Sequence, residues 1–247
     1  MTDNEWKAFL DFKSDFKSHI EKWNALSERL FPLQRAAAEK DTPAYPIETA
    51  VVYNRALDDV TKNDEIRLIV IGDNPGKDEQ RLQNNRYLVG QSGKIAEGYF
   101  KKNPELHIDF RKNSVILNKT PVHTAKTSHL KYLLKTGSEE IKNLIEESQI
   151  YMAQKTASLH KSLKSTGLWL VGYGELKEKG IFSLYRDTLK DAYDDSADWE
   201  RVFVFQHFSM NRFLIDLAAF QKEKPSLSLK ESIETLGRIH RVQIFGK

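Results

Sequence analysis

The stretch that decides the fold covers residues 66–100 and reads IRLIVIGDNPGKDEQRLQNNRYLVGQSGKIAEGYF. It begins with a short apolar run rich in β-branched residues, which predicts a buried strand. The run ends at GDNPG, residues 72–76, where two glycines and a proline permit a sharp turn and a close approach of a ligand to the backbone. A second tight turn follows at GQSG, residues 90–93, and Ser92 is the expected N-cap of a helix that reaches Phe100. We therefore expect strand, polar loop and helix N-terminus to enclose one pocket.

The composition is that of an ordinary globular protein. The 247 residues are 40% hydrophobic and 30% charged and include no cysteine, so disulfides and cysteine-ligated metal clusters are excluded. No apolar run approaches the ~20 residues of a membrane span, and the N-terminus MTDNEWKAFLDF lacks the features of a signal peptide. We expect a cytoplasmic monomer without a membrane partner. The net charge of +3 permits binding to nucleic acid without requiring it.

The remaining apolar patterns alternate between strand and helix. Helical spacing runs from residue 4 to 31, where Phe31 and Pro32 are expected to end the helix. Further helices are expected at 51–60, at 138–164, before Tyr193, at 213–220 and at 227–239, and further strands at 114–118, 168–171 and 201–206.

Four strands separated by helices predict a fold of the α/β class: a three-layer α/β/α sandwich around a four-stranded parallel sheet with right-handed crossovers. We expect a single domain over residues 1–247. Its parts are an N-terminal helical layer at 1–62, a core at 64–220 and a C-terminal helix and tail at 221–247.

Three polar clusters, at residues 73–80, 118–126 and 207–212, each follow a predicted strand. The ends of parallel strands share one edge of the sheet, and ligands bind at this edge in open α/β folds. We therefore expect the three clusters to converge on one site.

Several common motifs are absent from this site. A P-loop needs four residues between its glycines and a Ser or Thr after Gly-Lys, but three residues separate Gly72 from Gly76, and Asp78 follows Lys77. No Gly-x-Gly-x-x-Gly follows a strand, and the seven histidines form no close pair with a carboxylate between them. We expect neither a metal nor another cofactor.

Five motifs together resemble the uracil-DNA glycosylase superfamily. They are GDNPG at 72–76, VGQSG at 89–93, LNKTP at 117–121, WLVGYG at 169–174 and QHFS at 206–209, in this order. GDNPG is similar to the GINPG and GMNPG loops of the mismatch-specific and single-strand-selective branches, and to the GEAPG loop of the iron–sulfur branch. The chain departs from the family in three ways: the cysteines of an iron–sulfur cluster are missing, Phe208 replaces the proline of the His-Pro-Ser motif, and the loop between GDNPG and Val-Gly is longer than is usual in the iron–sulfur branch.

The resemblance implies hydrolysis of the N-glycosidic bond of uracil or another deaminated base in DNA. Asn74 falls on the catalytic asparagine of the first branches, Asp73 on the catalytic glutamate of the iron–sulfur branch, and His207 on the histidine of the second catalytic loop. Asn118 matches the asparagine that reads the uracil edge, and its amide offers both a donor and an acceptor. The full set comprises catalytic Asp73, Asn74 and His207; substrate-binding Gly72, Pro75, Gly76, Tyr87, Asn118 and Ser209; and DNA-binding Ser92, Met210 and Arg212.

The stacking face, the residue that positions the water and the role of four lysines each have more than one candidate. Tyr87, one place early relative to the family, is the expected stacking face for the base, with Phe100 as a second choice. Asp73 and Asn74 are both candidates for positioning the water. Four lysines fit either a phosphate track or a solvated face: Lys119, Lys126, Lys131 and Lys135.

Two other functions remain possible on these residues alone. One is a catalytically inactive member of the same fold that binds nucleic acid or a nucleotide. The other is a hydrolase of free nucleosides or another small ligand.

Overall fold

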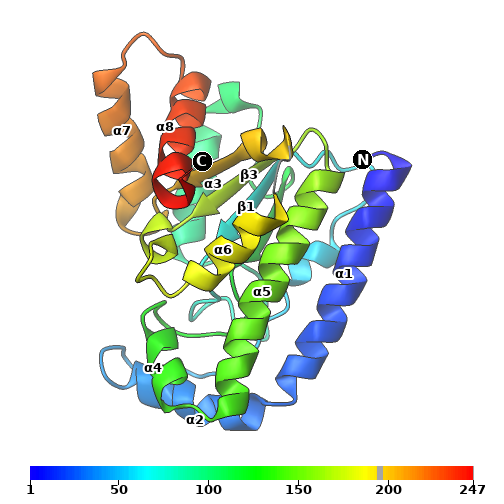
Figure 1. Cartoon of the computed structure of the whole chain (residues 1–247), viewed down its shortest axis with the longest axis vertical. Helices are drawn as coiled ribbons and strands as arrows, with labels where there is room; N and C mark the ends of the chain where they lie inside the picture. Colours follow the sequence, from blue (N-terminus) through cyan, green and yellow to red (C-terminus); the bar gives the residue numbers. More distant parts are fainter. Residues whose placement is uncertain (194–196, 247) are drawn as a thin grey trace.

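The computed structural model describes residues 1–193 and 197–246. Its centre is a four-stranded sheet in the order β2-β1-β3-β4, in which all neighbouring strands are parallel (Figure 1). The strands are β1 (Leu68–Gly72), β2 (Ser114–Asn118), β3 (Gly167–Val171) and β4 (Val202–Phe205). The predicted α/β fold with a four-stranded parallel sheet is confirmed.

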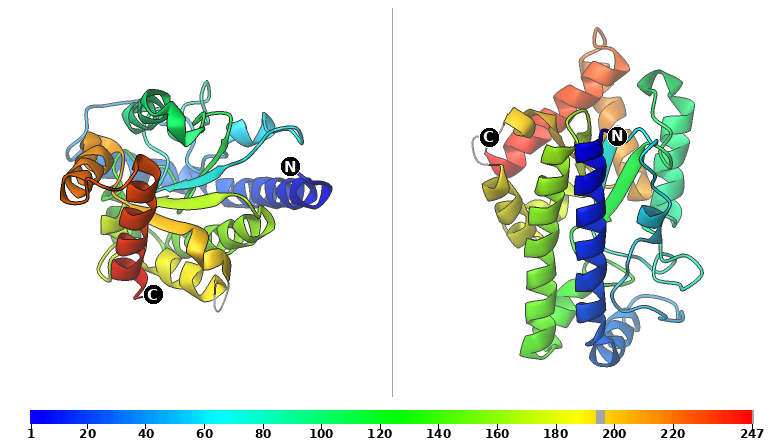
Figure 2. Two further views of the ribbon diagram at one scale, coloured as in Figure 1. Left: turned by 90° about the horizontal axis from the view of Figure 1, so that it is seen from above. Right: turned by 90° about the vertical axis from the view of Figure 1, so that its right-hand side faces the viewer.

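Helices cover both faces of this sheet, so the fold has three layers (Figure 2). Alternate residues of β1 point to opposite faces: Ile69 and Ile71 pack with the long helix α5 and its neighbours, whereas Leu68 and Val70 pack on the side of α3 and α7. All five residues of β1 are buried, as the uninterrupted apolar run in the sequence requires. The helices are α1 (Asp3–Asn24), α2 (Ser27–Ala38), α3 (Gln91–Lys102), α4 (His129–Thr136), α5 (Glu139–Ser162), α6 (Ser183–Ala192), α7 (Arg212–Glu223) and α8 (Leu229–Phe245), with 3₁₀ turns η1 (Arg55–Asp58), η2 (Pro104–Leu106), η3 (Tyr173–Leu176), η4 (Ala197–Arg201) and η5 (Ser209–Asn211).

The N-terminal region forms two helices rather than the one predicted. The break falls after Asn24, and Pro32 lies inside α2 instead of ending the helix. The Ser27 hydroxyl donates to Asn24 Oδ1 at 2.9 Å across the break. Helix α1 packs against α5, where the ring of Phe16 stacks on Tyr151.

The helix predicted at 51–60 is also wrong. Val51 forms an antiparallel bridge with Val122, and the Val52 N–H donates to Pro121 O at 2.9 Å, so this part of the chain is extended. Pairing with the loop after β2 overrides the local helical pattern.

The turn at 90–93 differs from its prediction in one detail. Gly90, not Ser92, is the N-cap of α3, and Ser92 lies in the first turn. A Cβ on Gly93 would lie only 1.4 Å from Leu88 O, so the close passage of the chain at this point requires glycine. No helix in the described part of the chain is long and apolar enough to cross a membrane.

Candidate active site

The candidate site lies at the carboxyl edge of the sheet, where β1 and β2 end side by side, whereas β4, which leads to His207, is separated from β1 by β3. Gly72, the last residue of β1, pairs in register with Asn118, the last residue of β2. The loop after β2 folds over the GDNPG turn, because Thr124 N–H donates to Pro75 O at 3.3 Å and the His123 ring bonds the same carbonyl at 2.8 Å. The predicted convergence of the first two polar clusters is therefore present.

Within the described part of the chain, the side-chain amide of Asn74 is held by hydrogen bonds from Nδ2 only. Its Nδ2 donates to Thr124 Oγ1 at 2.8 Å and to the carbonyl oxygens of Thr124 and Pro75, both at 3.3 Å. Its Oδ1 accepts no hydrogen bond from the described residues. An amide held in this way presents only an acceptor to the site, which is what orienting a water molecule requires.

Asn118 carries an unpaired donor. Its side chain is 2% exposed, and Nδ2 finds no acceptor among the described residues. A buried donor without a partner costs about 1–3 kcal/mol. A Cβ on Gly72 would lie 2.5 Å from Asn118 Oδ1, so the amide fits only beside a glycine. Nδ2 is therefore open to an acceptor atom of a ligand or a water molecule at this position.

Asp73 is not a free carboxylate. Its Oδ1 accepts from Lys119 Nζ at 2.6 Å and its Oδ2 accepts from Thr127 Oγ1 at 3.2 Å. Oδ1 also lies where a Cβ on Gly172, at the end of β3, would meet it at 2.5 Å. Both carboxylate oxygens are engaged, which leaves Asn74 as the better placed residue to hold a water.

Lys119 is buried among the strand ends, which fits neither a phosphate track nor a solvated face. It was a candidate for a phosphate track, but it has no exposed surface and its Nζ also donates to Val171 O at 2.6 Å. Burial lowers the pKa of Lys119, and the charges of Asp73 and Glu175 oppose this shift. Its position directly after Asn118 is the only signal in the sequence. Lys126, by contrast, is half exposed and pairs with Asp41.

The ring of His207 is held in one orientation by Ser209. Nδ1 accepts from the Ser209 backbone N–H at 3.1 Å and lies 2.8 Å from the Ser209 hydroxyl. With Nδ1 as an acceptor, a neutral ring carries its proton on Nε2. Burial lowers the pKa of His207; the charge of Asp73 opposes this and that of Lys119 adds to it. The imidazole is thus neutral at pH 7 and offers a donor at Nε2.

Phe208 has the backbone torsion that a proline would adopt at this position. Its φ is −66°, the value that proline imposes. Its side chain is fully buried, and its ring centroid lies 5.2 Å from Phe213 and 6.3 Å from Phe110. The ring packs into the core on the α3 and α7 side, where it anchors the loop.

The predicted stacking residues do not present an open face. Tyr87 is 1% exposed, and its hydroxyl donates to Val52 O at 2.6 Å. Phe100 is equally buried and stacks on Phe110 with centroids 5.5 Å apart. In this arrangement a base cannot lie on either ring unless the ring moves.

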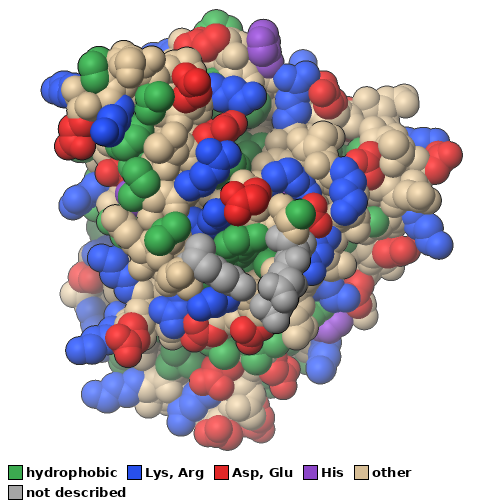
Figure 3. All heavy atoms as spheres, turned by 45° about the horizontal axis from the view of Figure 1, so that its top comes forward, with side chains coloured by type: hydrophobic (Ala, Val, Ile, Leu, Met, Phe, Trp, Pro, Cys, Tyr) green, Lys and Arg blue, Asp and Glu red, His purple; other side chains and the backbone are tan. Residues whose placement is uncertain are grey.

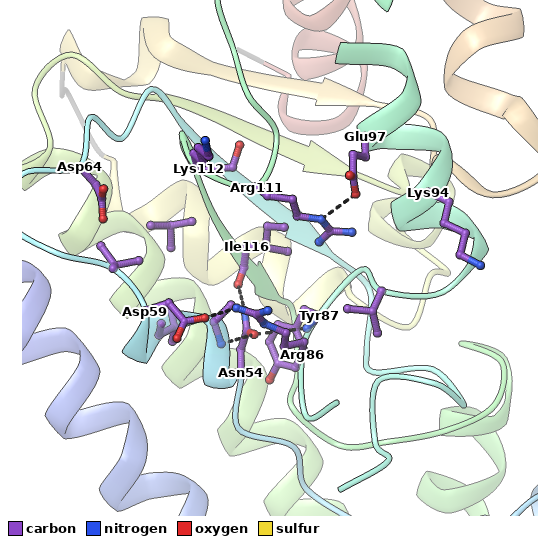
Figure 4. A pocket seen from close by; sticks show the side chains of 16 residues that line it. Asn54, Asp59, Asp64, Arg86, Tyr87, Lys94, Glu97, Arg111, Lys112 and Ile116 are labelled. Carbon is purple, nitrogen blue, oxygen red and sulfur yellow. Dashed lines mark hydrogen bonds and ion pairs between the residues drawn. The ribbon is translucent and has the colours of Figure 1, made fainter. Parts of the chain in front are cut away.

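Tyr87 instead lines a cavity of about 570 Å³ beside the free edge of β2 (Figure 4). There Asn54 Nδ2 donates to Ile116 O at 2.8 Å, and Arg86 pairs with Asp59. A second cavity, of about 510 Å³, lies at the amino ends of the strands and includes Arg67 and Gly167. Neither cavity includes any of the strand-end residues named above.

The rim of the site carries the predicted DNA contacts. Met210 is 73% exposed, and both Met210 and Asn211 have a left-handed backbone, with φ of 52° and 55°. Arg212 is exposed at the start of α7, and Ser92 is partly exposed. A left-handed backbone costs a residue with a side chain roughly 1–2 kcal/mol, so the loop holds Met210 outward against a local penalty.

Glu79 holds the end of the GDNPG turn by hydrogen bonds to two backbone N–H groups. Its carboxylate accepts from the N–H groups of Gly76, at 3.1 Å, and Leu88, at 2.8 Å. Burial raises the pKa of Glu79 to about 7, against the effect of these two hydrogen bonds. Pro75 is buried beneath the loop after β2, as its bonds to that loop require.

Among residues 1–193 and 197–246, no group of three His, Cys, Asp or Glu side chains is placed to hold a metal ion.

Comparison with known proteins adds no relative: no protein-family model matches the chain, and neither a curated protein nor a solved structure shows significant similarity to it.

Proposed function

We propose that this protein is a uracil-DNA glycosylase-like repair enzyme that hydrolyses the N-glycosidic bond of uracil or another deaminated base in DNA. The observation that carries the proposal is the unpaired Nδ2 of Asn118, buried beside Gly72 at the edge where Asn74 and His207 also lie. A carbonyl oxygen of a flipped base, such as O4 of uracil, would satisfy this donor.

Each remaining step of hydrolysis has a candidate group. Asn74 Oδ1 accepts from a water and directs its oxygen toward the sugar C1′. The bond from C1′ to the base nitrogen breaks, and its electron pair leaves with the base. His207 Nε2–H donates to the O2 of the departing base as negative charge develops there. The water oxygen bonds to C1′ and one of its protons passes through solvent to the departing base anion, so the products are the neutral free base and an abasic sugar.

The DNA partner is part of the same proposal. Met210 is placed as an apolar wedge and Arg212 as a phosphate contact beside His207. Basic side chains are mixed with acidic ones over the face drawn in Figure 3. The proposed contact with DNA is local, through Met210 and Arg212.

An assay of base release tests the proposal. Oligonucleotides that contain uracil, hypoxanthine or xanthine, in single and double strands, are incubated with the protein and with the variants Asn74→Ala and Asn118→Ala. We expect release by the unaltered protein and at least ~100-fold less by either variant. Asn103→Ala is the matched control, because that amide bonds only Tyr99 O at the end of α3. No release of any base, or equal release by all variants, would contradict the proposal.

A second candidate is an inactive member of the same fold that binds DNA. The closed faces of Tyr87 and Phe100 favour it, since a flipped base has no open ring to stack on. DNA binding without turnover, unchanged by Asn74→Ala, is its expected signature.

A further inference from the structure

Lys119 is a fully buried cation at the centre of the strand ends. Its ammonium has three N–H donors and three acceptors: Asp73 Oδ1 at 2.6 Å, Val171 O at 2.6 Å and Gly72 O at 3.4 Å. The ring of Phe182 lies 5.2 Å from Nζ. The ammonium therefore joins the ends of β1 and β3 from its place at the end of β2.

Stability alone does not explain such a residue. Replacing a buried ion pair by apolar side chains is often neutral or stabilising, because two charges must be removed from water to form the pair. Perturbed ionisable groups cluster at functional sites, so a buried charged pair beside candidate catalytic groups is a candidate member of the site. Here Asp73 is 12% exposed and Lys119 not at all, so solvent screens the pair weakly.

The ammonium reaches toward the loop that carries His207: Lys119 Nζ donates to Val171 O at 2.6 Å, and the N–H of the next residue, Gly172, donates to Phe205 O at 2.9 Å, two residues before His207. The charged groups that influence Lys119 are Asp73 and Glu175, and those that influence His207 are Asp73 and Lys119. Asp73 favours the charged imidazole and Lys119 the neutral one, so their effects on the ring oppose each other. The neutral ring, with its proton on Nε2, is the form that donates to a departing base.

We infer that Lys119 is a positioning residue of the proposed glycosylase site: it fixes the Asp73 carboxylate and offsets the charge of that carboxylate at His207. This inference rests on the proposed function for its kinetic consequence, but its effect on the imidazole does not need turnover. Glu175 lies on η3, beyond the end of β3. Its negative charge opposes the lowering of the Lys119 pKa, and it is not among the charges that shift the pKa of His207.

The test is an NMR titration of the His207 ring in the full-length chain. It compares the unaltered protein with Lys119→Met, Asp73→Asn and the double variant Asp73→Asn/Lys119→Met. Lys119→Met leaves Asp73 unopposed, so we expect the imidazole pKa to rise. Asp73→Asn should lower it, and the double variant should return it toward the unaltered value. An imidazole that titrates alike in all four proteins overturns the inference.

Kinetics give the second readout. If the protein releases bases, Lys119→Met should lower kcat by about 100-fold, as a displaced reacting group does, move the acidic limb of the pH profile to higher pH and change KM little. Unchanged kcat and pH profile in an active enzyme would also overturn the inference. If Lys119→Met does not fold, the comparison of Asp73→Asn with the double variant decides: equal imidazole titration in these two removes any role of Lys119 at His207. An inactive unaltered protein bears only on the proposed function, since the titration stands without turnover.

Discussion

The Asn74 amide is clamped by Thr124: Nδ2 donates to Thr124 Oγ1 at 2.8 Å, while Thr124 N–H donates to Pro75 O next to Asn74. The hydroxyl of Thr124 in turn donates to Lys126 O at 2.8 Å, which fixes its lone pair toward Asn74. The loop after β2 thus decides which way the amide in the turn after β1 points.

This relationship predicts the effect of Thr124→Val, which keeps the shape of the side chain and removes the acceptor. The Asn74 amide can then rotate about its side-chain bond, so Oδ1 would face the water of the proposed reaction only part of the time. We expect kcat for base release to fall by about 10-fold, with a loss of about 1 kcal/mol in the free energy of unfolding. Thr136→Val, at the exposed end of α4, is the control. Equal kcat in both variants would show that the clamp does not matter.

Gly72→Ala tests whether Asn118 must stay where it is. The new methyl would lie 2.5 Å from Asn118 Oδ1, so the amide has to move by more than a few tenths of an ångström. We expect base release to fall by about 100-fold. Gly76→Ala is a sharp control, because nothing lies within 4 Å of its added Cβ. Equal loss in the two variants would contradict the assigned role of Asn118.

Phe208 provides a test of how the histidine loop is held. Phe208→Ala leaves the torsion free and empties a fully buried position, so it should cost about 3–5 kcal/mol of unfolding free energy. Phe208→Pro also loses the ring but presets the observed φ of −66°, so we expect a smaller loss. Urea denaturation measures both. A proline variant less stable than the alanine variant would show that the torsion contributes nothing.

Glu79 predicts a dependence of stability on pH. Its pKa is 4.5 in the unfolded chain and is raised to about 7 in the folded protein by burial. Between these values the folded state binds more protons, so the unfolding free energy falls as pH rises from 4.5 to 7. The contribution of Glu79 is complete below pH 4.5 and lost above 7, and it is on the order of 3 kcal/mol.

The variant Glu79→Gln removes the titrating group and keeps an acceptor for one of the two N–H groups, because Gly76 and Leu88 donate to different carboxylate oxygens. Its unfolding free energy should decline less between pH 5 and pH 8 than that of the unaltered protein, as urea denaturation at the two pH values would measure. Glu105→Gln, at an exposed position, should retain the full decline. Parallel curves for Glu79→Gln and the unaltered protein would place the dependence on other groups.

Much of the fold followed from the sequence because it depends on local apolar runs. Each of the four strands is a short buried run, and a parallel sheet needs little more than this pattern and the helices between. The errors fall where tertiary pairing overrides local pattern, as at Val51, which bridges to Val122 across the chain. The N-cap assignment to Ser92 failed for a similar reason, since the passage of Leu88 O fixes the turn at Gly93.

The site was predicted less completely than the fold. That the clusters follow strands places them at one edge, but the sequence does not show which side chains bond each other there. Lysine is usually a surface residue, so the sequence favours an exposed Lys119. Its burial depends on acceptors at the ends of β1 and β3. Tyr87 was the expected stacking face for a base, but it is buried and its hydroxyl donates to Val52 O, so it belongs to the core.

The exposed loop after β4 contains Met210 and Asn211. Met210 and Asn211 both have a left-handed backbone, which glycine adopts without strain. Met210→Gly and Asn211→Gly should each raise the free energy of unfolding by about 1 kcal/mol. Their effects on base release should differ if Met210 is the wedge.

Opening a duplex requires an apolar side chain that fills the space left by the flipped base, whereas a single strand needs none. We therefore expect Met210→Gly to lower release from duplex DNA by about 10-fold or more, to leave release from single strands nearly unchanged, and Asn211→Gly to change neither. The comparison separates the wedge from loop strain, because both variants relieve the same backbone conformation and only one removes an exposed apolar side chain. An equal loss on single and double strands would instead mean that Met210 contacts the substrate without entering the duplex.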